Sequence, residues 1–169
     1  NQQGVLAQSG GGHAFFYNVI SGNGTWGLEL QAATNCTVRQ NLFGTDPSGA
    51  SACGNGNAGI FLNAGAAHNQ IGGRWLDEGN VFSGNNLYGV RVQDATTVSN
   101  VFKGNRVGTD GSGFLAVPND EGFWIYNAPF NTIGSTNADE RNVISGNSIV
   151  GIDIMGTNSH HNLVIGNYI

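Results

Sequence analysis

Charge is the property that this sequence has least of. Charged residues make up 10% of the chain, against roughly 25% in an average domain. Only six of them are lysine or arginine, and the formal net charge is −5. Because the sequence has no basic stripe or cluster, we expect no binding to nucleic acid or to an anionic membrane surface.

Long apolar runs are also missing. No run approaches the roughly 18 apolar residues that a membrane-spanning helix needs, so we expect no membrane insertion. Glycine, in contrast, accounts for 28 of 169 residues, against an average of about 7%. The 39% of apolar residues can fill a core, and the glycines and asparagines predict a fold with many tight turns.

One hexapeptide returns at a fixed interval. Residues 18–23 read NVISGN, residues 80–85 read NVFSGN and residues 142–147 read NVISGN, so each step is 62 residues. A second, glycine-led pattern keeps this interval and has further copies about halfway between, namely GLEL (27–30), GIFL (59–62), GVRV (89–92), GFWI (122–125) and GIDI (151–154). The underlying unit is therefore about 31 residues long, which indicates a solenoid, a propeller or an array.

The spacing of apolar residues decides among these architectures. GVRV and GIDI alternate with a period of two, as strands with one buried face do. Each unit holds three short strand-like stretches, and none shows helical periodicity over the length of a helix. The sequence therefore predicts an all-β fold: one parallel β-helix over residues 1–169, with about six coils of three short strands stacked about 4.8 Å apart.

These motifs resemble a known family of folds. NVISGN, GTDPSG (44–49), NQIGG (69–73) and DERNVISGN (139–147) resemble the right-handed parallel β-helix repeats of the pectin-lyase-like superfold. They are most similar to the repeats found in large secreted bacterial surface proteins. The resemblance covers nearly all of the chain and implies a right-handed solenoid that is secreted or on the cell surface. It does not imply one activity, since the superfold includes lyases, hydrolases, epimerases, adhesins and inert spacers.

Stacking the six coils predicts two outward columns beside the glycine-led stretches. The first column reads Leu6, Glu29, Phe61, Arg91, Trp124 and Asp153, and the second reads Gln8, Gln31, Asn63, Gln93, Tyr126 and Met155. Carbohydrate stacks well on aromatic rings, so Phe61, Arg91, Trp124 and Tyr126 form a candidate carbohydrate-binding face. The alternative is a row of cross-strand pairs, with Arg91 held between Phe61 and Trp124 by cation–π contacts.

Catalysis on this face has little support. Glu29 and Asp153 are four coils apart, or about 19 Å at 4.8 Å per coil. A pair of carboxylates that hydrolyses a glycoside lies only about 5–10 Å apart. We therefore predict no catalytic residues.

The asparagines of the hexapeptide predict a scaffold role. Asn18, Asn80 and Asn142 recur on alternate coils, where stacked amide side chains can hydrogen-bond along the column. We expect them at the corners of the coils, where asparagine tolerates a left-handed φ.

Two acidic loop motifs carry weaker signals. Asp46 and Asp110 lie in GTDPSG and GTDGSG, where a carboxylate and nearby carbonyls could bind calcium; an Asx-turn is the alternative. One carboxylate per loop is a poor calcium site, so no cofactor is predicted. The pairs 77–78 and 139–140, both Asp-Glu, are expected to be solvated loop charges.

The two cysteines leave two interpretations open. Cys36 and Cys53 match no metal-binding or redox spacing. They are candidates for a disulfide that joins a coil to its own loop in an oxidising compartment. Two buried free thiols are the alternative.

The ends of the chain suggest partners. An open β-helix end is an unpaired sheet edge over an exposed core, and we identify no cap in the sequence. Asn1 stands three residues before Gly4, just as Asn119 stands before Gly122. We therefore expect this chain to meet flanking β-helix segments or to stack end to end with itself.

A structural role follows as the predicted function. We expect a secreted or cell-surface adhesin, stalk or filament subunit rather than an enzyme. The alternative is a carbohydrate-binding or polysaccharide-lyase-like β-helix that has a polysaccharide as its partner.

Overall fold

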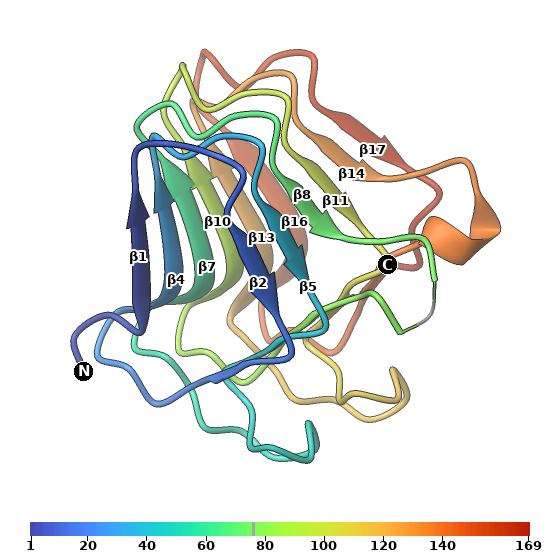
Figure 1. Ribbon diagram of the computed structural model, residues 1–169. Helices are drawn as coiled ribbons and strands as arrows, with labels where there is room; N and C mark the ends of the chain where they lie inside the picture. The colour runs from blue at the N-terminus through green and yellow to red at the C-terminus, as the bar shows by residue number, and fades with distance from the viewer. Residues whose placement is uncertain (76) are drawn as a thin grey trace.

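The computed structural model describes residues 1–75 and 77–169. The chain winds through about six coils, and equivalent strands of successive coils pair side by side and in parallel (Figure 1). The predicted fold, a right-handed parallel β-helix, is confirmed. Within the described residues the one helical element is the 3₁₀ turn η1 (Ala138–Glu140), and none there is long and apolar enough to cross a membrane.

Three parallel sheets run along the molecule. The first contains β1 (Val5–Gln8), β4 (Trp26–Gln31), β7 (Ala58–Asn63), β10 (Tyr88–Gln93), β13 (Glu121–Tyr126) and β16 (Val150–Met155). The second contains β2 (Ala14–Phe16), β5 (Thr37–Arg39), β8 (Gln70–Gly72), β11 (Val101–Lys103), β14 (Thr132–Gly134) and β17 (Leu163–Ile165). The third contains β3 (Val19–Ile20), β6 (Leu42–Phe43), β9 (Val81–Phe82), β12 (Arg106–Val107) and β15 (Val143–Ile144).

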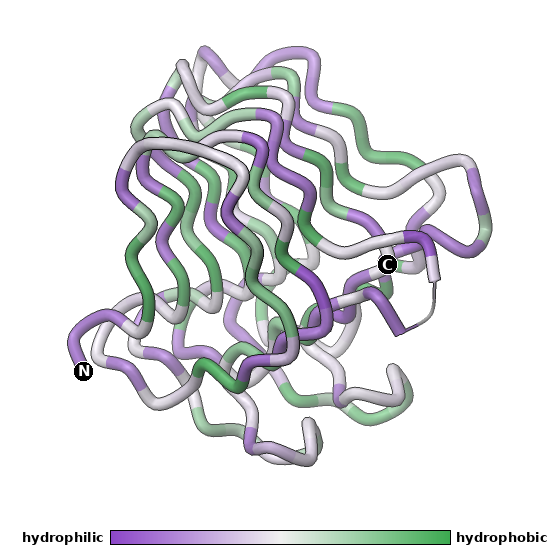
Figure 2. The backbone as a smooth tube through the Cα atoms, viewed as in Figure 1, coloured by the Kyte–Doolittle hydropathy of each residue, from purple (hydrophilic) through white to green (hydrophobic). Residues whose placement is uncertain are grey.

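The core lies between the three sheets. Apolar and polar residues alternate along the stacked strands (Figure 2), and the apolar residues of the inner coils that face the core are buried. Successive coils also stack their aromatic side chains, for example Phe43 on Phe82 with ring centroids 4.8 Å apart. The period-two alternation therefore predicted the buried face correctly.

Columns of asparagine hydrogen-bond from coil to coil, as predicted. In the longest ladder each Nδ2 donates to the Oδ1 of the asparagine one coil further on, at 2.8–3.1 Å. Its members are Asn18, Asn41, Asn80, Asn105, Asn142 and Asn167. A second ladder contains Asn23, Asn55, Asn85, Asn119 and Asn147, and a third contains Asn69, Asn100 and Asn131. The ladder therefore occupies every coil rather than alternate ones.

The left-handed φ predicted for Asn18, Asn80 and Asn142 is not found at any of them. Tyr17, which precedes Asn18, has a φ of 58°, and His68, which precedes Asn69, has a φ of 56°. At Asn142 the preceding residue is not left-handed either, because Arg141 is extended with a φ of −65°. The position of the left-handed residue therefore differs from coil to coil.

The last coil exposes positions that every inner coil buries. Ile154 in β16 is 39% exposed and Val164 in β17 is 40% exposed, whereas their neighbours Ile125 and Ile133 are 0% exposed. At the other end of the stack, core-facing Val5 and Ala7 of β1 are also only partly buried. The six coils thus present apolar surface at both ends.

Candidate functional site

The outward face of the first sheet has the predicted register. Pairing from β1 to β16 aligns one residue per coil, in the order Leu6, Glu29, Phe61, Arg91, Trp124 and Asp153. The second predicted column is also aligned where strands pair, for example Gln93 with Tyr126 and Tyr126 with Met155. The four candidate carbohydrate-binding residues therefore lie on one face.

A third outward column on this face was missed. In the second to sixth coils, strand pairing aligns the residue that precedes the glycine. These residues are Trp26, Ala58, Tyr88, Glu121 and Val150. The sequence was interpreted with glycine as the first strand residue, which placed these side chains in the preceding turns. Trp26 and Tyr88 thereby add two aromatic rings to the candidate face.

Arg91 lies at the centre of this aromatic cluster. Its guanidinium carbon is 4.8 Å from the ring centroid of Phe61 and 4.7 Å from that of Trp124, so the predicted cation–π sandwich is confirmed. Trp26 and Tyr88 contact the same guanidinium at 5.3 and 5.7 Å. Burial among these rings lowers the pKa of Arg91 from its usual value.

The aromatic rings also stack on one another. Trp26 packs on Phe61 with centroids 4.6 Å apart, and Trp124 packs on Tyr126 at 5.2 Å with an interplanar angle of 13°. Phe61 is consequently only 7% exposed, whereas Tyr126 is 37% exposed. Ring faces that already contact Arg91 or another ring have little area left for a sugar, so Tyr126 is the most accessible of the four candidates.

The carboxylates of this face lie in separate environments. Glu29 is 6% exposed and accepts hydrogen bonds from Gln3 Nε2 at 2.7 Å and Asn63 Nδ2 at 2.9 Å. Glu121 lies further along the sheet, where burial, together with the negative charges of Asp153 and Asp120, raises its pKa. Glu29 is thus held by neutral amide donors, and Glu121 was not identified from the sequence.

The loops that carry Asp46 and Asp110 have the geometry of Asx-turns. Each carboxylate accepts a hydrogen bond from a serine hydroxyl two residues later, Ser48 or Ser112, at 2.7 Å. Backbone N–H groups of the same loop also donate to it. The serine hydroxyl bonds lower the pKa of both carboxyls. Calcium binding by these loops stays an untested alternative, and the described residues hold no cluster of three or more acidic, histidine or cysteine ligands.

The glutamates of the other loops are not freely solvated, contrary to the prediction. Glu78 pairs with Arg39 at 2.7 Å, and Glu140 pairs with Lys103 at 2.9 Å. Each cation lies on the preceding coil, about one unit earlier in the sequence, so the contact could not be inferred from local charge pattern. The two ion pairs are equivalent in the repeat, with the glutamates 62 residues apart and the cations 64 residues apart. This recurrence indicates a role in holding the loops to the coils.

The cysteines are both free. Cys36 is buried at the start of the second sheet, where its N–H donates to Asn69 Oδ1, and Cys53 is exposed. The candidate disulfide is therefore not formed in this structure. The interpretation as two buried thiols holds for Cys36 alone, whose pKa is raised by burial.

Replacing Trp124 by alanine tests the structural role of the aromatic cluster. We expect Trp124→Ala to lower the free energy of unfolding by about 2 kcal/mol, because it removes a partly buried cation–π partner and two ring contacts. Trp75→Ala is the matched control, since Trp75 is 57% exposed, and should cost about 0.5 kcal/mol or less. Urea denaturation measures both, and equal losses would contradict the cluster's role.

Comparisons with known proteins returned no significant match to a family model, to a curated protein or to a solved structure.

Proposed function

We propose that this chain is a structural β-helix segment of a secreted or cell-surface protein, such as an adhesin, stalk or filament, in which further coils cover its ends. The observation that carries the proposal is the 39–40% exposure of Ile154 and Val164 at positions that inner coils bury completely. A second copy stacked end to end, or a flanking β-helix segment, would bury this surface. The motif resemblance supports the wider assignment to the pectin-lyase-like superfold.

The amide ladders support end-to-end stacking because they have a direction. Every Nδ2 donates towards the higher-numbered coil, so the first coil leaves Asn18 Oδ1 as an acceptor. At the other end, Asn167 Nδ2 donates one hydrogen to Ile133 O, and its second hydrogen has no acceptor among the described residues. The first coil of one copy could therefore continue the ladder of the last coil of another.

Such a contact would join two different surfaces. A head-to-tail contact of this kind does not close on itself unless it turns through a ring, so a straight stack extends as a fibre. Parallel pairing would continue the sheets across the junction, because β1 and β16 are both edge strands of the same sheet. Stacking would cover unpaired edges that otherwise favour aggregation.

A charge placed on the last coil tests this proposal. We expect Ile154→Lys to abolish head-to-tail assembly, because Ile154 faces the core axis at the open end and an unpaired ammonium cannot be buried there. Met155→Lys is the control, since Met155 is 45% exposed in the same strand but points to the outer face. Sedimentation velocity and electron micrographs over a range of concentrations measure the effect.

The results of this experiment distinguish stacking between copies from contact with flanking β-helix segments. Assembly of the wild type and of Met155→Lys, with a monomeric Ile154→Lys that still melts cooperatively, supports stacking between copies. A wild type that stays monomeric at high concentration would contradict self-stacking and leave flanking segments as the partners. Equal assembly of both lysine variants would contradict the end contact.

Carbohydrate binding is the second candidate function. It is favoured by the continuous aromatic row along the first sheet, with Tyr126 exposed at its edge. A glycan array that includes uronate polymers tests it, with Tyr126→Ala as the variant and Trp75→Ala as the control. A wild-type protein that binds no glycan would remove this candidate.

A further inference from the structure

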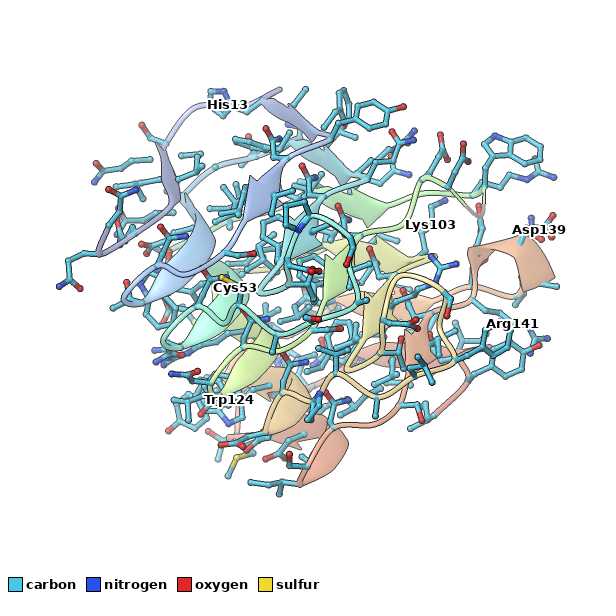
Figure 3. The ribbon with its side chains drawn as sticks, turned by 90° about the horizontal axis from the view of Figure 1, so that it is seen from below. His13, Cys53, Lys103, Trp124, Asp139 and Arg141 are labelled. Carbon is cyan, nitrogen blue, oxygen red and sulfur yellow. The ribbon has the colours of Figure 1, made fainter. Side chains whose placement is uncertain are left out.

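A small pocket lies on the outer side of the third sheet, away from the aromatic cluster around Arg91 on the first sheet. It has a volume of about 160 Å³ and is enclosed between β12, β15 and the loop that contains η1. Arg106, Asp139, Arg141, Val143 and Tyr168 contribute to its lining. In Figure 3, Asp139 and Arg141 lie on the opposite side of the coils from Trp124. About 10–15 Å³ of such space holds one water molecule, so the pocket can admit a small ligand.

Two of its side chains are arginines without anionic partners. Among the described residues, neither Arg106 nor Arg141 takes part in an ion pair or donates a side-chain hydrogen bond, and Arg141 Nε is buried without a partner. The guanidinium of Arg141 lies over the ring of Tyr168 at 5.0 Å, which leaves its N–H edges available in the plane of the group. Asp139 has no cation within ion-pair distance in this part of the structure.

The other basic residues are differently placed. Arg39 and Lys103 pair with glutamates, and Arg91 donates to Gln93 Oε1 within its aromatic cluster. Arg74 is exposed and stacks on Trp75 at 5.1 Å. Among the described residues, three of the six basic side chains thus have no ion pair and lie outside the aromatic cluster, namely Arg74, Arg106 and Arg141. Two of these three, Arg106 and Arg141, line one pocket.

The internal repeat provides a comparison for this pocket. Arg106 in NRVGTD corresponds to Leu42 in NLFGTD, and Arg141 in DERNVISGN corresponds to Gly79 in DEGNVFSGN. Asp139 corresponds to Asp77, and these equivalent residues line a hollow at the same place one repeat earlier. Arg106 also lines that earlier hollow, at the place that Tyr168 takes in the pocket. The earlier hollow therefore has one arginine and the pocket has two, and the added guanidinium is that of Arg141.

We propose that this pocket binds a small oxyanionic group, namely a carboxylate, sulfate or phosphate. Guanidinium groups bind such anions through pairs of charge-assisted N–H···O bonds, and two arginines line this pocket. With Asp139 counted, the pocket carries a net charge of +1 in an acidic chain. The site is independent of end-to-end stacking and of the aromatic row.

The double variant Arg106→Leu/Arg141→Gly tests the site, because it introduces the two residues that the preceding repeat already has. Arg74→Gln is the control, since it removes one exposed arginine outside the pocket. Sodium sulfate, sodium phosphate and sodium acetate are titrated separately against the full chain, at an ionic strength held constant with sodium chloride. Shifts of backbone amide and arginine Nε–H signals in ¹H–¹⁵N spectra locate the binding and distinguish the three anion classes.

We expect saturable shifts at Arg106, Arg141 and Tyr168 with at least one of the three anions. The double variant should bind that anion about tenfold more weakly or worse, because each lost charge-assisted hydrogen bond has roughly this effect. Arg74→Gln should bind within about twofold of wild type. Absence of saturable shifts in the wild type, equal binding by the double variant, or shifts confined to other residues would each overturn the proposal.

Discussion

Ile125→Asp is expected to leave no folded protein at neutral pH. Ile125 is 0% exposed and lies in the core between Val92 and Ile154 on the adjacent coils. A carboxylate at this place has no cation to pair with and no water, which costs about 5 kcal/mol or more. This is comparable with the whole free energy of unfolding of a typical domain. Circular dichroism and chemical denaturation measure the loss.

Ile154→Asp is the matched control in the same column. Ile154 is 39% exposed on the last coil, so its carboxylate remains hydrated and the variant should fold. Burial raises the folded-state pKa of an aspartate at position 125 above its unfolded value of about 3.9. The protonated state therefore favours folding, and the deficit of Ile125→Asp should shrink as the pH falls towards 4. If Ile125→Asp instead melts like wild type at pH 7, the assignment of Ile125 to the core is contradicted.

Asn105→Ala is expected to lower the free energy of unfolding by about 4 kcal/mol. The Oδ1 of Asn105 accepts from the N–H and the Nδ2 of Asn80, and its Nδ2 donates to Ile71 O and Asn142 Oδ1. These partners are buried, so they would be left without hydrogen bonds rather than returned to water. Urea denaturation monitored by circular dichroism measures the change.

Asn18→Ala is the control at the exposed end of the same ladder. It removes the hydrogen bond to Asn41 Oδ1, but Asn18 is exposed and water can replace the lost contact. We expect a cost of about 1 kcal/mol or less. Equal losses in the two variants would show that position in the ladder has no effect.

The fold could be predicted because the repeat supplies the same information six times. The alternation in GVRV and GIDI determines which residues face the core, and their spacing determines which residues become neighbours on adjacent coils. The outward column from Leu6 to Asp153 was therefore correct at each position. Stacked asparagines were predictable for the same reason, since NVISGN returns in step with the strands.

Features that depend on one residue position or on the path of a loop were less predictable. The left-handed residue is Tyr17 before Asn18 and His68 before Asn69, whereas Arg141 before Asn142 is extended, so no common side chain marks this position. Trp26, Tyr88 and Glu121 precede the glycine taken as the strand start, and their column was overlooked. Glu78 meets Arg39 because its loop folds back over the preceding coil, which the sequence spacing does not show.

The pocket arginines were overlooked for a related reason. Arg106 and Arg141 lie within motifs that otherwise repeat closely, and the repeat indicates only the positions that the copies share. The sequence does mark these two positions, because the second copy of the repeat has arginine where the first copy has Leu42 and Gly79. In repeat proteins, departures from the repeat are therefore informative about binding, whereas the repeat itself is informative about the scaffold.

The asparagine ladders would allow the β-helix to be lengthened by whole repeat units. Each asparagine bonds to its counterparts on neighbouring coils and to nearby backbone carbonyls. These bonds recur from coil to coil, so insertion of one 62-residue unit would rejoin the cut ends of the ladders. Each such unit would lengthen the rod by about 10 Å, the height of two coils. Duplication or deletion of this unit in the gene would therefore change the distance between two domains attached to the ends of the β-helix in fixed steps.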